Sequence, residues 1–102
     1  MSADNGIYIL KAIDNHRKEG RWLVNAPFTS YRVAHVQAID DLSYLQENEP
    51  YNVGCYLRDT WGHSKVYDSL ETAMQKAIEL SKGYSVLEYG IRVIETEYVF
   101  YT

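Results

Sequence analysis

Residues 66–93, VYDSLETAMQKAIELSKGYSVLEYGIRV, predict one helix followed by one strand. Asp68 or Ser69 is suited to cap the helix, because a side-chain oxygen at this position accepts the free amide hydrogens of the first turn. Gly83 is suited to end it, since glycine enters the left-handed cap conformation without a steric cost. The inward stripe of the helix recurs at spacings of three and four residues: Leu70, Ala73, Met74, Ala77, Ile78 and Ser81.

The strand predicted after this helix has one buried face, and we expect the helix to lie on it. Its inward residues alternate along the chain: Leu87, Tyr89, Ile91 and Val93. The alternation breaks over residues 94–97 and resumes at Val99 and Tyr101. This break predicts a bulge or a bend that returns the apolar side chains to the buried face of the strand. The alternative is that the tail pairs with another protomer.

The first part of the chain predicts strands. Gly6–Ile13 is apolar on both faces apart from Lys11, which indicates an interior strand or a strand with a second protomer on one face. Arg21–Val24 is expected to pair back onto it as a hairpin, with a longer loop than the tight two-residue kind. Tyr31–Ala38 predicts a third strand. The expected core face is the side that is small and apolar apart from its arginine: Arg32, Ala34, Val36 and Ala38.

The middle of the chain predicts a short helix and a second hairpin. Asp40 or Asp41 is suited to cap a helix that runs through Gln46. Tyr51–Arg58 predicts the first strand of the hairpin, and Ser64–Tyr67 predicts the returning strand.

The predicted elements follow the order ββ-β-α-ββ-α-β. Strand pairs joined by hairpins favour an α+β fold, with an antiparallel sheet of about five to six strands and two helices on one face. The length of 102 residues suits a single domain over residues 1–102.

Composition excludes several classes of protein. The formal net charge is −4 and no basic block is present, which argues against binding along duplex DNA. No apolar stretch approaches the ~20 residues of a membrane-spanning helix, so a cytosolic setting is expected. The single cysteine, Cys55, excludes an internal disulfide and is expected to be a buried structural thiol. The ten tyrosines suit half-buried sheets and interfaces.

The main candidate site is the tip of the second predicted hairpin. It carries Tyr56, Arg58, Trp61, His63 and Lys65. An arginine, a tryptophan and a histidine at one tip offer the stacking and cationic contacts that a nucleotide, a phosphate-bearing metabolite or a protein partner requires. The alternative is that the tryptophan folds back over the sheet while the charges stay in water.

Secondary candidates are Arg17, Arg21, Trp22 and His35. The first three belong to the only local cluster of positive charge, which is either a solvated connector or a contact for an anion or a partner. His35 lies on a predicted strand and is expected to be half-buried and satisfied. The three histidines lie far apart without ligand spacing, so no metal site is predicted, and no glycine-rich phosphate loop or other cofactor motif is present.

Three segments carry a resemblance to a known group of proteins. These are Met1–Leu10 (MSADNGIYIL), Tyr31–Ile39 (YRVAHVQAI) and Leu87–Ile91 (LEYGI). The chain resembles small proteins encoded by tailed bacteriophages, a group without an assigned activity. The resemblance implies the cytoplasm of an infected bacterium and an accessory role rather than a part of the virion.

We therefore expect a non-enzymatic accessory protein that acts against host defence by binding. It would bind a host protein through a tyrosine-rich surface, or sequester a small nucleotide-like signal near Arg58, Trp61 and His63. The alternative is a small enzyme that acts on a nucleotide or acyl substrate with His35 or His63 as general base. Self-association into a homo-oligomer is expected from the apolar second face of Ile7–Ile13 and from the tyrosine-rich tail.

Overall fold

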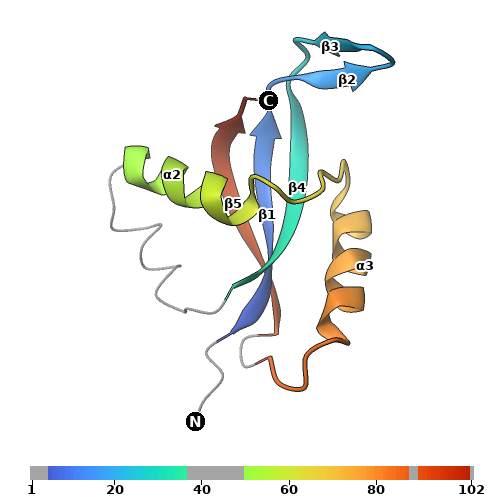
Figure 1. The fold of residues 1–102 in the computed structure, drawn as a ribbon, viewed down its shortest axis with the longest axis vertical. Helices are drawn as coiled ribbons and strands as arrows, with labels where there is room; N and C mark the ends of the chain where they lie inside the picture. Colours follow the sequence, from blue (N-terminus) through green and yellow to red (C-terminus); the bar gives the residue numbers. More distant parts are fainter. Residues whose placement is uncertain (1–4, 37–49, 88–89, 102) are drawn as a thin grey trace.

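A computed structural model describes residues 5–36, 50–87 and 90–101, and it shows an α+β fold (Figure 1). The strands and helices are β1 (Gly6–Asp14), β2 (Arg17–Glu19), β3 (Trp22–Val24), β4 (Phe28–Val36), α2 (Pro50–Trp61), α3 (Leu70–Ser81) and β5 (Ile91–Phe100). A three-stranded sheet has the order β4-β1-β5, and β2 and β3 form a separate two-stranded sheet. The predicted helix from Asp40 or Asp41 to Gln46 lies outside the described residues.

Strand β1 is the interior strand of the sheet, which is one of the two arrangements that its sequence predicted. Successive side chains of a strand point to opposite faces, so a strand that is apolar throughout builds a core on each side. Ile7 and Ile9 pack with Ala73 and Ala77 of α3 on one face. Leu10 and its neighbours on the other face pack with α2 in a second core: Tyr8, Leu10, Ala12, Val36, Leu57, Trp61 and Phe100.

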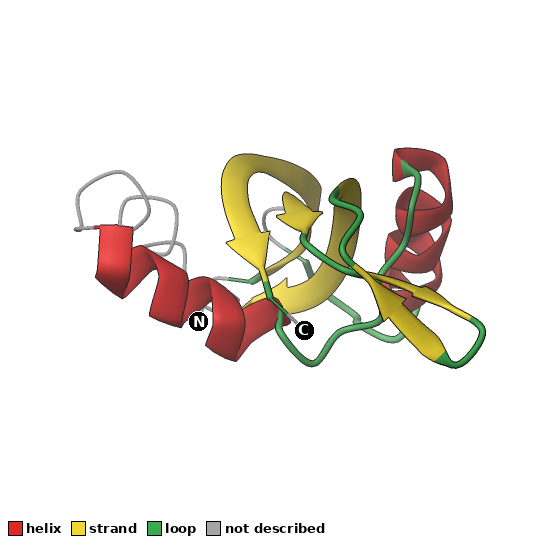
Figure 2. Ribbon diagram, turned by 90° about the horizontal axis from the view of Figure 1, so that it is seen from above, coloured by secondary structure: helices red, strands yellow, loops and turns green. Residues whose placement is uncertain are grey.

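The two helices therefore cover opposite faces of the sheet, and the prediction that they share one face is wrong (Figure 2). The second face of β1 is covered by α3. This removes the apolar surface on which the sequence-based expectation of self-association was partly based.

Strand β5 runs parallel to β1, whereas β4 runs antiparallel to it. Helix α3 returns the chain to the end of the sheet where β1 begins, so the next strand enters in the same direction as β1 (Figure 1). The sheet is thus small and mixed, and the predicted antiparallel sheet of five to six strands is wrong. Helix α3 contacts β5 but lies mainly against β1 and β4.

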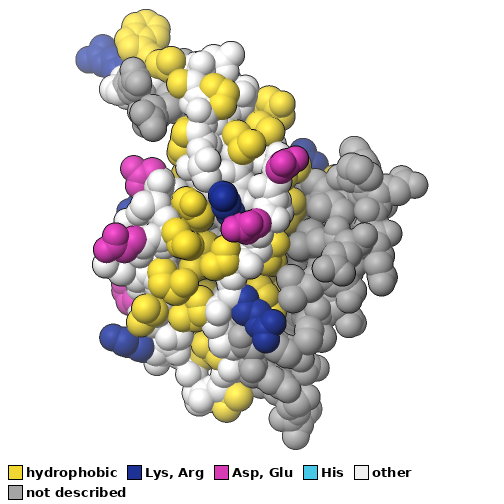
Figure 3. All heavy atoms as spheres, turned by 180° about the vertical axis from the view of Figure 1, so that it is seen from behind, with side chains coloured by type: hydrophobic (Ala, Val, Ile, Leu, Met, Phe, Trp, Pro, Cys, Tyr) yellow, Lys and Arg dark blue, Asp and Glu magenta, His cyan; other side chains and the backbone are white. Residues whose placement is uncertain are grey.

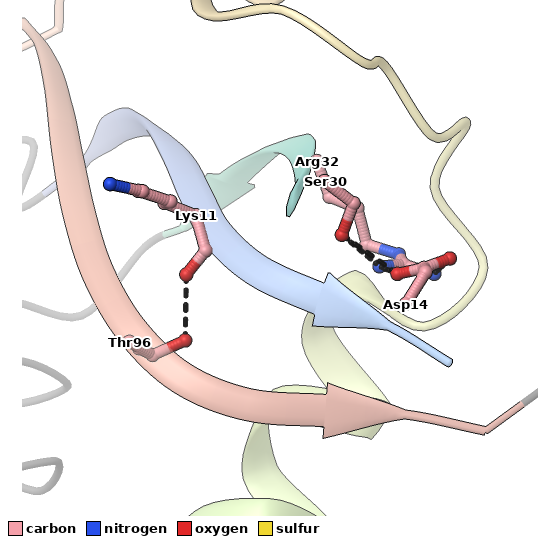
Figure 4. A network of polar contacts seen from close by, with 5 residues as sticks. All are labelled: Lys11, Asp14, Ser30, Arg32 and Thr96. Atoms are coloured by element: carbon pink, nitrogen blue, oxygen red, sulfur yellow. Dashed lines mark hydrogen bonds and ion pairs between the residues drawn. The ribbon is translucent and has the colours of Figure 1, made fainter. Parts of the chain in front are cut away.

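The predicted bulge in the last strand is confirmed. Lys11 lies opposite Glu95 and Ile13 lies opposite Val99, so the register shifts between these two pairs. A bulge interrupts the ladder of backbone hydrogen bonds, and a carbonyl left there needs another donor. The Thr96 hydroxyl supplies it by donating to the Lys11 carbonyl at 2.7 Å (Figure 4).

Residues 50–61 form helix α2 where a strand was predicted. Pro50 is the first helical residue, a position where the missing amide hydrogen costs nothing. Leu57 and Trp61 lie one turn apart and both enter the core under the sheet. Gly62 follows, and a Cβ there would overlap the carbonyl oxygen of Arg58. The predicted returning strand is reduced to an isolated bridge between Tyr31 and Tyr67.

The β2–β3 hairpin, here called the ribbon (residues 17–24), projects from one end of the sheet (Figure 1). Trp22–Val24 pair with Arg17–Glu19 and not with β1, so the predicted pairing is wrong. The loop has two residues, Gly20 and Arg21, and Gly20 adopts φ 59°. Glycine at the first position of a two-residue loop meets this positive φ without strain.

Helix α3 confirms the predicted helix, with two differences at its ends and on its face. Ser69 is the N-cap, and its hydroxyl accepts the Thr72 amide at 3.2 Å. The C-cap is Lys82 in a right-handed conformation, so Gly83 does not act as a left-handed cap. Leu70 and Ile78, both predicted to face inward, are exposed, while Leu80 packs against the core.

No helix in the described part of the chain is long and apolar enough to cross a membrane.

Candidate functional site

Trp61, the centre of the predicted contact site, is fully buried. Its side chain is 0% exposed at the end of α2, and its indole Nε1 donates to the Tyr8 carbonyl at 3.2 Å. The helix turns this ring under the sheet, whereas a hairpin tip would have presented it to solvent. The prediction that Trp61 offers a stacking surface to a ligand is therefore wrong in its structural basis.

Three other residues of that predicted site, Arg58, His63 and Lys65, lie at the surface. Arg58 and His63 are exposed, and Lys65 lies beyond them on the connector to α3. Arg58 Nη2 donates to the Cys55 sulfur at 3.4 Å, and this contact raises the pKa of the arginine. Cys55 itself is half-buried. The side chain of Tyr56 lies outside the described part of the structure.

Lys65 borders an open groove of about 720 Å³ at the base of the ribbon. Its lining comes from the residues that flank the ribbon and from the connector and start of α3: Asp14, His16, Phe28, Lys65, Val66, Tyr67, Asp68 and Thr72. The Lys65 ammonium lies 5.6 Å from the centre of the Tyr67 ring. His16 Nδ1 is buried and has no hydrogen-bond partner among the described residues. The groove combines aromatic, apolar and charged walls.

Trp22, a secondary candidate, has the opposite environment to Trp61. It is 73% exposed on the first residue of β3, and Arg21 beside it in the loop is exposed as well. Hydrophobic and basic side chains stand at the end of the molecule from which the ribbon projects (Figure 3). The Arg17 side chain lies outside the described part of the structure.

The ribbon differs in charge from the rest of the chain. It holds Arg17, Lys18 and Arg21 against Glu19, so it carries a formal +2 while all other residues together carry −6. A net positive charge on a projecting element is suited to contact with an acidic surface.

His35 is half-buried and satisfied, as predicted. Its ring stacks on Tyr84, with centroids 4.1 Å apart and an interplanar angle of 19°. His35 Nε2 also lies within hydrogen-bond distance of Asn5 Nδ2, at 3.2 Å. Neither His35 nor His63 forms a hydrogen bond with a serine, threonine or cysteine in the part of the chain described above. Within that same part, no group of histidine, cysteine and carboxylate side chains has a metal-binding arrangement.

A buried ion pair lies between β1 and β4, and sequence reasoning missed it. Both carboxylate oxygens of Asp14 accept hydrogen bonds from Arg32, at 2.6 and 3.1 Å, and Ser30 Oγ donates to Asp14 at 2.7 Å (Figure 4). The guanidinium also lies 3.8 Å from the centre of the Phe100 ring. An available signal was Arg32 on the predicted core face, because a buried charge requires a buried partner.

Hydrophobic side chains also gather on the face seen from behind (Figure 3). The exposed large hydrophobic residues of the chain include Ile78 of α3, Val86 of the loop after it and Val93 of β5. Val93 is 39% exposed because α3 lies mainly over β1 and β4 and leaves this part of β5 open.

Comparison of the chain with protein-family models, with curated proteins and with solved structures found no match.

Proposed function

We propose that this protein is a non-enzymatic binding protein whose ribbon contacts a host protein. The observation that carries the proposal is Trp22, which is 73% exposed at the tip of a projecting hairpin. Tryptophan and arginine are the residues that most often dominate binding energy at protein interfaces. Arg21 and Trp22 lie side by side, and neither side chain hydrogen bonds or forms an ion pair with another described residue.

The position of the ribbon supports a role in contact rather than in stability. Among the described residues its strands pair with each other and with no further strand, and Trp22 belongs to neither core cluster. A large apolar ring kept in water has a cost that burial against a partner removes. The resemblance of residues 1–10 to small bacteriophage proteins supports an infected bacterium as the setting and host defence as the process affected.

The other candidate functions have less support from the geometry. Burial of Trp61 removes the ring against which a nucleotide-like signal would have stacked near Arg58 and His63. A general base needs a nucleophile or a bound water within hydrogen-bond reach, and the His35 ring is instead occupied by Tyr84 and Asn5.

The test is capture of a host protein from extracts of infected bacteria. Tagged wild-type protein, Trp22→Ala and Tyr101→Ala are compared; Tyr101 is a matched control because it is 75% exposed and lies outside the ribbon. We expect a host protein that is retained by wild type and Tyr101→Ala and lost with Trp22→Ala. Equal retention by all three proteins, or loss only with Tyr101→Ala, would contradict the proposal.

A further inference from the structure

The ribbon and strands β1 and β4 are parts of one interrupted hairpin. Strand β1 pairs antiparallel with β4 as far as Asp14 and Phe28. The pairing resumes in the ribbon at Arg17 and Val24, with two residues between the pairs on the first strand and three on the second. One of the three is Pro27, which has no amide hydrogen to donate. Because the unequal spacing breaks the ladder of hydrogen bonds, the ladder alone does not fix the direction of the ribbon.

A buried polar network lies at the last pair before this interruption (Figure 4). Asp14, the final residue of β1, accepts hydrogen bonds from Ser30 Oγ at 2.7 Å and from two nitrogens of Arg32 at 2.6 and 3.1 Å. All three residues are buried, and Ser30 and Arg32 lie on β4 shortly after Phe28. The network therefore joins the strand that enters the ribbon to the strand that leaves it.

The third strand of the sheet is fastened at the same place. Asn15, the first residue after β1, donates its backbone amide to the Phe100 carbonyl at 3.0 Å. The Arg32 guanidinium lies 3.8 Å from the centre of the Phe100 ring, and Asp14 is the register partner of Phe100 in the ladder between β1 and β5. These contacts hold three strand ends together at the point where the ribbon begins.

An ion pair is a costly way to hold a buried strand end. Removing two charges from water costs free energy that their attraction only partly offsets, and apolar side chains of similar size often serve stability equally well. What the pair adds is direction, because two parallel N–H···O bonds between Arg32 and Asp14 restrict the relative orientation of the strands that carry them. A function in orientation accounts for a charged pair at this position.

We propose that Asp14, Ser30 and Arg32 are positioning residues of the ribbon. Their network fixes the direction in which the ribbon leaves the sheet, and so the direction in which Trp22 is presented. Trp22 belongs to neither core cluster, so its position relative to the sheet depends on the ribbon backbone. A ribbon that is ordered before binding loses less conformational entropy on contact with a partner. The inference rests on the proposed function in assigning Trp22 to a contact surface.

NMR relaxation of the backbone amides measures the order of the ribbon. In wild type we expect order parameters for residues 17–24 near the value of about 0.85 that is typical of rigid backbone. The double variant Asp14→Leu/Arg32→Met removes both charges and leaves no buried charge unpaired. Its ribbon is expected to fall below about 0.6, while β1 and β4 keep the wild-type values. Far-UV circular dichroism verifies that the variants keep their fold.

Two further variants separate orientation from stability. Val36→Ala shortens a buried side chain at the other end of β4, opposite Gly6, and should lower the free energy of unfolding without changing the order of the ribbon. Arg32→Lys keeps a cation beside Asp14 but replaces the two parallel bonds with a single contact, so its ribbon should have intermediate order. Arg32→Lys also decides the question if the double variant does not fold.

Three results would overturn the inference. The first is a wild-type ribbon whose order parameters already lie below about 0.6. The second is a ribbon that is as ordered in the folded variants of Asp14 and Arg32 as in wild type. The third is an equal loss of order in Val36→Ala, which would assign the effect to general destabilisation.

Capture of the host protein distinguishes this inference from the proposed function. The host protein that wild type retains should bind the double variant roughly tenfold more weakly and should bind Val36→Ala unchanged. Equal retention by a double variant with a disordered ribbon overturns the positioning role and leaves the proposed function in place. Capture that does not depend on Trp22 overturns the proposed function, whereas the NMR comparison still decides whether the network orients the ribbon.

Discussion

The end of α2 and the ribbon each carry one tryptophan, in opposite environments. Trp61 is 0% exposed and bonds to the backbone of β1, while Trp22 is 73% exposed on a hairpin outside both cores. The same side chain therefore contributes to stability in one region and is available for contact in the other. The difference lies in the element that carries each ring. Trp61 stands on a helix that packs against the sheet, whereas Trp22 stands on a ribbon that belongs to neither core cluster of the described residues.

The largest expected effect is that of Trp61→Ala. Deleting a buried ring leaves a cavity and removes the hydrogen bond to the Tyr8 carbonyl, so the free energy of unfolding should fall by about 3–5 kcal/mol. Urea denaturation followed by circular dichroism measures the change. A variant with the same free energy of unfolding as wild type would show that the packing of α2 does not stabilise the sheet.

A loss of similar size is expected from Arg32→Met. The substitution leaves the Asp14 carboxylate buried without its cation, and breaking a buried pair in this way costs about 3–5 kcal/mol. The double variant Asp14→Leu/Arg32→Met removes both charges and should recover much of the stability. If the single and double variants unfold at the same urea concentration, the ion pair is not the reason for the loss.

Two glycine substitutions compare the regions at the level of the backbone. Gly62→Ala forces a Cβ against the Arg58 carbonyl at the end of α2 and should lower the free energy of unfolding by about 1–3 kcal/mol. Gly20→Ala meets no neighbouring atom, and its cost is only the strain of φ 59°, about 1–2 kcal/mol, confined to the ribbon. The melting temperature should therefore fall more for Gly62→Ala than for Gly20→Ala. A larger fall for Gly20→Ala would contradict the placement of Gly62 in the packed part of the fold and of Gly20 in the ribbon.

The smallest expected effect on stability is that of Trp22→Ala. A side chain exposed to this extent and outside both cores should change the free energy of unfolding of the monomer by no more than about 0.5 kcal/mol. Fluorescence of single-tryptophan proteins gives an independent measurement at low concentration. Trp61→Phe, which keeps Trp22, should be quenched readily by acrylamide, and Trp22→Phe, which keeps Trp61, should resist quenching.

Local sequence signals predicted the features that depend only on residues close together in the chain. The Ser69 cap, the small residues of α3 and the apolar run of β1 each describe a short segment, and each was confirmed. The loss of alternation after Val93 likewise predicted the bulge. These features follow from backbone hydrogen bonds and side-chain periodicity within one element.

The region around α2 shows why local signals were insufficient for the candidate site. Residues 51–58 include two tyrosines and a valine, residue types that favour a strand. However, Leu57 and Trp61 lie one helical turn apart, and Pro50 suits a first helical position. Leu57 and Trp61 pack against β1 when residues 50–61 are helical, and this packing stabilises the helix. The helix places Trp61 in the core and not at the expected surface.

The amino-acid sequence alone was sufficient for the α+β class, the two apolar faces of β1, the extent of α3 and the irregularity in the last strand. Tertiary structure decided that β5 pairs in parallel, that the helices take opposite faces, that Arg32 meets Asp14, and which tryptophan reaches solvent. The physical reason is distance along the chain: periodicity reports which side of an element is apolar. It does not report which distant element will cover that side.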